Sequence, residues 1–122
     1  MDSILIVDDD IKLCATLSED LNEIGYFTHF VTNVEDALNY LKTSNVDLIL
    51  LDLKMPEKDG FHLLNHVKKN SADIKIIVLT ANIDVESAVK AAQLGVDDYI
   101  LKPFKFEKLL ITTQKILKKE LV

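Results

Sequence analysis

The chain has 122 residues, of which 48% are hydrophobic, and its formal net charge is −6 at pH 7. This length and apolar content fit one domain with its own core, and the acidic balance argues against a nucleic-acid-binding surface, which usually needs a clustered basic face. A single cysteine, Cys14, cannot form an internal disulfide. No signal-peptide pattern opens the chain, and charges interrupt each apolar run before it could span a bilayer. We therefore expect a soluble cytoplasmic protein.

Short branched apolar runs alternate with longer amphipathic stretches. In chain order, the predicted elements are a strand at Ile4–Val7, a helix at Ile11–Ile24, a strand at Phe27–Val31, a helix at Val34–Lys42, a strand at Asp47–Leu51, a helix at Phe61–Lys69, a strand at Lys75–Thr80, a helix at Val85–Leu94, a strand at Asp97–Leu101 and a helix at Phe106–Leu121. Asn33 and Asp84 are predicted helix N-caps, and Gly25 and Gly95 are predicted helix stops.

Five strands that alternate with five helices predict an α/β fold, a (βα)5 doubly wound five-stranded parallel sheet with helices on both faces. The flavodoxin-like strand order 2-1-3-4-5 is the natural choice for five strands, and its switch point lies between strands one and three. The sequence shows no repeats, linkers or low-complexity segments, and its three glycines leave no room for a Gly-rich phosphate loop. We therefore expect a single domain over residues 1–122.

Four of the apolar runs stop at a polar residue that could handle a phosphoryl group. Asp8 and Asp9 follow the first run, Asp52 follows the third, Thr80 ends the fourth, and Lys102 follows the fifth. In an open parallel sheet, ligands bind just beyond the carboxyl ends of the strands. Carboxylates, a hydroxyl and an ammonium are therefore expected to meet in one crevice, a combination that suits a divalent metal ion and a phosphate.

The acidic cluster after the first strand has two interpretations. Asp8, Asp9 and Asp10 could cap the following helix and oppose its dipole, and Asp10 fits that role best because it lies furthest from the strand. Together with Asp52, however, Asp8 and Asp9 predict a magnesium (Mg²⁺) site, because a hard divalent cation relieves the repulsion between clustered carboxylates. A cation site without phosphate chemistry is the alternative.

Asp52 is the predicted nucleophile. Met55-Pro56 forces an extended or turned backbone and Asp59-Gly60 is a strong turn signal, so the loop should leave the strand abruptly and expose the Asp52 side chain. A carboxylate beside a metal ion can form an aspartyl-phosphate. The alternative is a strand-end aspartate that caps a loop.

Thr80 and Lys102 are the predicted phosphate ligands. The Thr80 hydroxyl could donate a hydrogen bond to a phosphoryl oxygen, although many strands carry a threonine without such a role. Lys102 is enclosed by Leu101 and Pro103-Phe104, where a solvated lysine is less expected, and it can neutralise phosphate as a compact point charge. The tight turn required there makes Lys102-Pro103 a candidate cis peptide.

These residues together resemble the response-regulator receiver domain of two-component signal transduction. The resemblance covers essentially the whole chain and rests on Asp8-Asp9, on Asp52 with Lys54-Met55-Pro56 and Asp59-Gly60, on Thr80-Ala81, and on Tyr99 through Lys102-Pro103-Phe104. It implies a phosphorylation-dependent signalling switch.

The resemblance also implies a role for each matching residue. Asp52 would be the phosphoacceptor, and Asp8, Asp9, Asp52 and the backbone carbonyl of Lys54 would bind Mg²⁺. Thr80 and Lys102 would hold the phosphoryl oxygens. Thr80 and Tyr99 would form the switch, in which the Tyr99 ring turns inward as Thr80 moves toward the phosphate. The alternative for Tyr99 is an ordinary tyrosine near a sheet edge.

The same resemblance implies partners and an output. The phosphoryl group would come from a sensor histidine kinase or a histidine phosphotransfer protein. Phosphorylation would change the surface of the last two helices and the strand between them, with formation of a homodimer as one outcome. The chain would promote only its own phosphorylation and dephosphorylation, so it is not expected to be an enzyme, nor to bind nucleic acid or a membrane directly. It would be either free-standing or the N-terminal receiver of a transcription regulator.

Two other functions are compatible with parts of this pattern. A haloacid-dehalogenase-like phosphatase also forms an aspartyl-phosphate beside Mg²⁺, but it usually has a second aspartate two residues after the nucleophile, where this chain has Lys54. A flavodoxin-like cofactor binder would need a phosphate-shaped loop after the first strand, and Asp8–Asp10 would repel the cofactor. His62 and His66 are four residues apart but should lie on the solvated side of their helix, and Cys14 should lie in the core.

Overall fold

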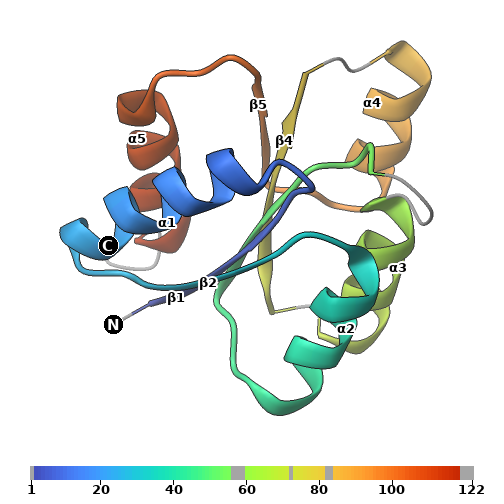
Figure 1. Ribbon diagram of the computed structural model, residues 1–122. Coiled ribbons are helices and arrows are strands. Elements are labelled where there is room, and N and C mark those ends of the chain that lie inside the picture. The colour runs from blue at the N-terminus through green and yellow to red at the C-terminus, as the bar shows by residue number, and fades with distance from the viewer. Residues whose placement is uncertain (1, 56–59, 72, 82–83, 119–122) are drawn as a thin grey trace.

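The computed structural model describes residues 2–55, 60–71, 73–81 and 84–118, in which five strands alternate with five helices (Figure 1). The elements are β1 (Ser3–Val7), α1 (Ile11–Ile24), β2 (Phe27–Val31), α2 (Val34–Thr43), β3 (Leu48–Leu51), α3 (Gly60–Asn70), β4 (Lys75–Thr80), α4 (Val85–Gln93), β5 (Asp98–Leu101) and α5 (Phe106–Leu117). No helix among the described residues is long and apolar enough to cross a membrane.

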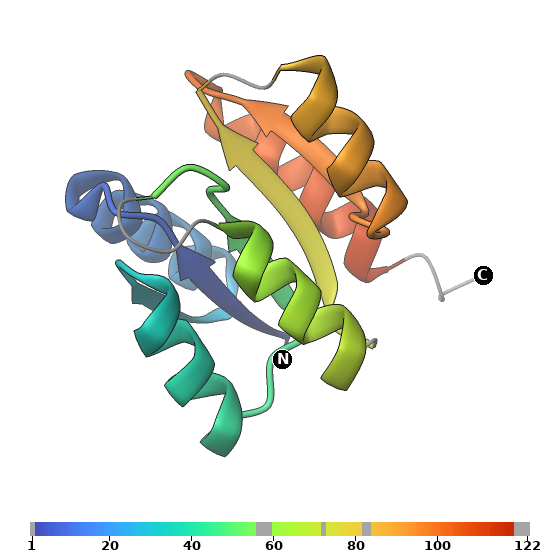
Figure 2. The ribbon, with the colours of Figure 1, turned by 90° about the vertical axis from the view of Figure 1, so that its right-hand side faces the viewer.

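The strands form one parallel sheet in the order β2-β1-β3-β4-β5, which confirms the predicted topology. Helices α1 and α5 cover one face of the sheet, and α2, α3 and α4 cover the other, which faces the viewer in Figure 2. The continuous apolar runs are explained by this arrangement, because a strand buried on both faces needs an apolar side chain at every position.

Each face of the sheet has its own core. In β1, Ile4 and Ile6 point toward α1 and α5, where they pack with Cys14, whereas Leu5 and Val7 point toward the opposite face. Cys14 is fully buried, as predicted. The alternation follows from strand geometry, in which successive side chains point to opposite faces.

The predicted caps lie at the helix ends. The Asn33 side chain accepts a hydrogen bond from the Asp36 amide at the start of α2, and Asp84 accepts one from the Ser87 amide at the start of α4. Gly25 ends α1 with a φ of 117°, and Gly95 follows α4 with a φ of 82°. Both values lie in the left-handed region, where glycine is favoured over side chains with a Cβ.

Two predicted strands begin one residue later than expected. β3 starts at Leu48 and β5 at Asp98, and the side chains of the preceding aspartates cap neighbouring strands. Oδ2 of Asp47 accepts a hydrogen bond from the Ser3 amide at 2.7 Å, and Oδ2 of Asp97 accepts one from the Ile76 amide at 2.8 Å. At the chain's end, α5 stops at Leu117, and the predicted extension over residues 119–121 lies outside the described residues.

Candidate phosphoacceptor site

The topology brings the ends of β1 and β3 together. Val7 and Leu51 are register partners, so the aspartates that follow them, Asp8 and Asp52, leave the sheet side by side. Backbone hydrogen bonds hold both positions: the Asp8 amide donates to the Val31 carbonyl at 3.2 Å, and the Asp52 amide donates to the Val7 carbonyl at 2.9 Å. The sheet itself therefore fixes the spacing of these two carboxylates.

Three carboxylates converge at this edge of the sheet. One oxygen from each of Asp8, Asp9 and Asp52 lies within 4.8 Å of the other two. Asp8 and Asp52 are buried, with 1% and 7% of their surfaces exposed, whereas Asp9 is exposed. The expectation that the loop exposes the Asp52 side chain is therefore wrong. Clustered carboxylate oxygens are the donors that Mg²⁺ prefers, and the exposed side of the cluster leaves room for water ligands. The donor set fits such an ion.

Lys102 supplies the positive charge of the site. Its Nζ lies 2.6 Å from Oδ2 of Asp8 and 3.5 Å from Oδ2 of Asp52. Burial alone would lower the pKa of Lys102, but the hydrogen bond and charge of Asp8, and then the charge of Asp52, outweigh it and raise the pKa above its ordinary value. The lysine is therefore fully protonated at neutral pH and partly neutralises the cluster.

Asp52 is held less firmly than Asp8. Its Oδ1 accepts a hydrogen bond from the Lys54 amide at 3.0 Å. Burial raises the pKa of Asp52 above its ordinary value, and the charges of Asp8 and Asp9 act in the same direction, although the Lys54 amide and Lys102 oppose the rise. A carboxylate whose charge is poorly compensated in this way is stabilised by a nearby cation or by conversion of the ionised oxygen to an acyl phosphate.

The loop after Asp52 returns close to it. At Gly60, a Cβ atom would lie 2.6 Å from the Asp52 carbonyl oxygen and 2.7 Å from Cα of Leu53, so this approach requires glycine. The Gly60 amide also donates to the Leu53 carbonyl at 2.8 Å. Pro56 and Asp59, which carried part of the turn prediction, lie outside the described residues.

Thr80 and Lys102 stand at the ends of neighbouring strands, as predicted. Thr80 is the last residue of β4 and is 1% exposed, and the Lys102 amide donates to its carbonyl at 2.9 Å. The peptide bond between Lys102 and Pro103 is cis, which confirms that expectation.

Asp10 and Cys14 support the cluster from α1. Asp10 is the N-cap of α1, where its side chain accepts a hydrogen bond from the Leu13 amide at 3.1 Å, as predicted. The Cys14 thiol donates to the Asp8 carbonyl at 3.3 Å, a contact that sequence reasoning missed because periodicity indicated only that Cys14 is buried. Burial raises the pKa of Cys14 to about 12, so it is a neutral thiol and not a nucleophile.

Tyr99 connects β5 to α4. Its ring is half-buried, and its hydroxyl donates to the Ala88 carbonyl at 2.7 Å. His62 and His66 are exposed on α3, in agreement with their predicted position.

The family model for the response regulator receiver domain matches residues 4–114. The chain belongs to this family. Receivers are the phosphoryl-accepting switches of two-component response regulators, and the match does not favour the phosphatase alternative.

Relatives and solved structures agree with the family. The chain is 40% identical over 116 residues to a probable transcriptional regulator, ycf27, of Cyanidium caldarium, covering 95% of this chain and 46% of that protein. It resembles a CheY-like receiver domain protein from Methanospirillum hungatei JF-1 with a TM-score of 0.94 and 28% identity, over 98% of this chain and 95% of the other. It also resembles TrrA of Thermotoga maritima, solved in complex with Mg(2+)-BeF, with a TM-score of 0.85 and 34% identity, over 96% of this chain and 100% of the other. The chain spans about half the length, or less, of the curated relatives that it matches.

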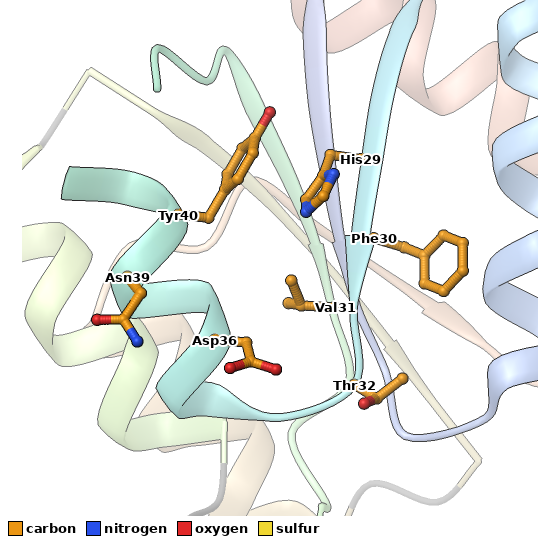
Figure 3. Close-up of a pocket in the computed structure, with 7 residues that line it drawn as sticks. All are labelled: His29, Phe30, Val31, Thr32, Asp36, Asn39 and Tyr40. Carbon is orange, nitrogen blue, oxygen red and sulfur yellow. The ribbon is translucent and has the colours of Figure 1, made fainter. Parts of the chain in front are cut away.

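Two cavities of the receiver can be compared with the position of the candidate site. One of about 410 Å³ adjoins the carboxylate cluster and is lined by Asp10, Leu13, Ala81, Lys102, Pro103 and Phe104. Another of about 530 Å³ lies between β2 and α2 (Figure 3) and is lined by His29, Phe30, Val31, Thr32, Asp36, Asn39 and Tyr40. There the rings of His29 and Tyr40 stack with their centroids 4.1 Å apart. Neither cavity is lined by the clustered carboxylates, but the first is lined by Lys102, which contacts them, so the larger volume of the second does not locate the chemistry.

Proposed function

We propose that this chain is a single receiver domain whose Asp52 accepts a phosphoryl group from the phosphohistidine of a sensor histidine kinase or a histidine phosphotransfer protein. One observation carries the proposal: Asp52 is a buried carboxylate in a cluster with Asp8 and Asp9, and it lies 3.5 Å from the ammonium of Lys102. The family match supports the same chemistry.

Each residue of the site would have its own role in the phosphoryl transfer. A carboxylate oxygen of Asp52 attacks phosphorus, the bond from phosphorus to the donor's imidazole nitrogen breaks, and that nitrogen leaves with the bonding electron pair and takes up a proton. Lys102 and the Thr80 hydroxyl would hold phosphoryl oxygens, which places positive charge and a donor where negative charge accumulates. The cavity lined by Lys102 and Phe104 would receive part of the donor next to the Lys102 ammonium.

Asp8, Asp9, Asp52 and the backbone carbonyl of Lys54 would hold Mg²⁺. When bound, the ion supplies charge neutralisation for the phosphoryl oxygens. The three converging carboxylates support this assignment, as does the Mg(2+)-BeF complex of the similar TrrA receiver.

The output would be a change in the surface of α4, β5 and α5. Thr80 and Tyr99 would couple that surface to Asp52, and the hydrogen bond from Tyr99 to Ala88 of α4 supports such a connection. Exposed apolar side chains, Val85, Val89, Leu101 and Ile111, lie on these elements. A homodimer or an output domain could occupy that surface. Curated relatives are longer transcriptional regulators, which supports a role as the N-terminal receiver of such a protein, and a free-standing receiver is the alternative.

The direct test is phosphorylation by acetyl phosphate with Mg²⁺, followed by mass spectrometry of the intact protein. The wild type should gain one acid-labile phosphate, and Asp52→Asn should gain none. Asp73→Asn, at an exposed aspartate, is the matched control and should behave as the wild type. Phosphate retained by Asp52→Asn, or absent from the wild type, would rule out the assignment.

A further inference from the structure

An ion pair joins the two segments that leave β3 and β4. Nζ of Lys54 lies 3.7 Å from Oδ2 of Asp84, and the two side chains are 54% and 58% exposed. Lys54 stands two residues after Asp52, and Asp84 stands four residues after Thr80. The pair therefore links the segment next to the phosphoacceptor with the start of α4.

Both partners are also hydrogen-bonded to the elements that they connect. The Lys54 amide donates to Oδ1 of Asp52 at 3.0 Å, and Oδ1 of Asp84 accepts from the Ser87 amide at 2.7 Å. The Ser87 hydrogen bonds, and after them Lys54, hold the pKa of Asp84 below its ordinary value, so it is a carboxylate at neutral pH. Contacts thus run from Asp52 through Lys54 and Asp84 to the first turn of α4.

The two lysines at the site differ in how firmly they are held. Lys102 is bound to Asp8 at 2.6 Å with 20% of its side chain exposed. Lys54 has a longer contact and is mostly exposed, and its partner Asp84 lies outside the carboxylate cluster. Exposed ion pairs are weak and easily exchanged, and a lysine ammonium on its flexible stem can change partners.

We propose that the Lys54 ammonium exchanges Asp84 for the phosphoryl group on Asp52, so that Asp84 is a positioning residue that restrains the unphosphorylated state. This inference rests on the proposed phosphoacceptor function. Phosphorylation places additional negative charge and acceptor oxygens next to the Lys54 backbone. The ammonium then has a stronger partner than Asp84, and α4 loses a charge contact at its N-cap.

The test is a double-mutant cycle on the affinity for beryllofluoride, a phosphoryl mimic, in the presence of Mg²⁺. Asp84→Asn removes the charge but keeps a good N-cap residue, so the helix start is preserved. This variant should bind beryllofluoride about two- to fivefold more tightly than the wild type, the range that an exposed ion pair allows. In a Lys54→Gln background, the same substitution should lose most of that effect.

Glu86→Gln is the matched control because it removes an exposed carboxylate from the same first turn of α4. It measures the general effect of one fewer negative charge, which should be smaller and independent of Lys54. The inference is overturned if Asp84→Asn changes the affinity no more than Glu86→Gln does, or changes it equally with and without Lys54.

A second readout follows the helix directly. The amide NMR signal of Ser87 should shift when beryllofluoride is added to the wild type and should shift less in Lys54→Gln. A Ser87 signal that responds equally in both proteins contradicts the exchange. If the wild type binds no beryllofluoride and takes up no phosphate, the phosphoacceptor function itself fails, which is a different result from normal binding without coupling.

Discussion

Lys102 is paired with Asp8 at 2.6 Å across 94 positions of sequence, and this contact holds the end of β5 against the end of β1. Asp8 is 1% exposed, so its carboxylate has few water molecules to stabilise its charge. The ion pair is therefore part of the folded framework as well as of the site.

The first prediction concerns the loss of this pair. Lys102→Met should lower the free energy of unfolding by about 1–3 kcal/mol, because it leaves Asp8 buried without its cation. Lys108→Met, at an exposed lysine of α5, should change it by no more than about 0.5 kcal/mol. Urea unfolding of both variants measures the difference. Equal changes in the free energy of unfolding would mean that the Lys102–Asp8 pair does not stabilise the fold.

Removal of the Asp52 charge should raise the free energy of unfolding. Because the pKa of Asp52 is raised in the folded protein, the stability linked to this group is present below its ordinary pKa of 3.8 and is lost as the pH rises through the folded value. Asp52→Asn should therefore be more stable than the wild type at neutral pH, by more than the roughly 0.5 kcal/mol spread of surface substitutions.

The gain should shrink as the pH falls through the raised pKa of the folded Asp52 toward its ordinary value of 3.8, because Asp52 in the wild type then also becomes protonated. Urea unfolding at several pH values measures it, with Asp73→Asn as the control. A gain that grows toward acid pH would contradict the assigned direction of the pKa shift.

The adjacent aspartates Asp9 and Asp10 should have different roles, Mg²⁺ binding for Asp9 and helix capping for Asp10. Asp9→Ala should weaken Mg²⁺ binding by at least about tenfold, because Asp9 offers a carboxylate to the cluster. Loss of a group that only orients a metal ligand already has an effect of about that size. Asp10→Ala should instead lower stability by about 0.5–2 kcal/mol through loss of the N-cap of α1. NMR titration with Mg²⁺ and urea unfolding measure the two effects, and equal losses of Mg²⁺ affinity would show that the cluster is misassigned.

The sequence predicted the fold and the site's main residues because both depend on periodicity. Apolar runs identified the strands, and the parallel topology then placed Asp8, Asp52, Thr80 and Lys102 at one edge. Polar residues next to helix starts identified the caps at Asn33 and Asp84. These features are local in the chain or follow from strand order.

Other features depend on how side chains meet in space, and no pattern indicated them. The sequence did not show that Lys102 lies nearer to Asp8 than to Asp52, or that Lys54 pairs with Asp84. The sequence analysis also placed Asp47 and Asp97 inside strands. A residue just before an apolar run can either begin that strand or cap a neighbouring one, and the sequence does not distinguish the two.

Thr113 is a buried polar residue in α5 that leads to a further prediction. It is fully buried, and its hydroxyl has no hydrogen-bond partner among the described residues. Thr113→Val should raise the free energy of unfolding by about 1 kcal/mol or more, since it removes an unsatisfied hydroxyl with little change of shape. Thr112→Val is the control, because the Thr112 hydroxyl donates to the Lys108 carbonyl at 2.9 Å and its loss should give no gain. A destabilised Thr113→Val would indicate that the hydroxyl has a partner in solution.

The last prediction concerns the path from Asp52 to α4 through Tyr99. The Tyr99 hydroxyl is bonded to the Ala88 carbonyl, so movement of the ring must break or reshape a contact with α4. Beryllofluoride with Mg²⁺ should therefore shift the backbone NMR signals of residues 85–99 as well as those next to Asp52. Such a response is a two-state change biased by a local charge event.

Tyr99→Phe keeps the ring but removes the hydroxyl that contacts Ala88. The signals of α4 should then respond less to beryllofluoride, while those next to Asp52 respond as in the wild type. Tyr40→Phe is the matched control, because that half-buried tyrosine of α2 stacks on His29 of β2 (Figure 3), and α3 separates α2 from α4 (Figure 2). Changes confined to the neighbourhood of Asp52 in the wild type would show that the switch does not reach α4. An undiminished α4 response in Tyr99→Phe would show that the ring, and not its hydroxyl, carries the coupling.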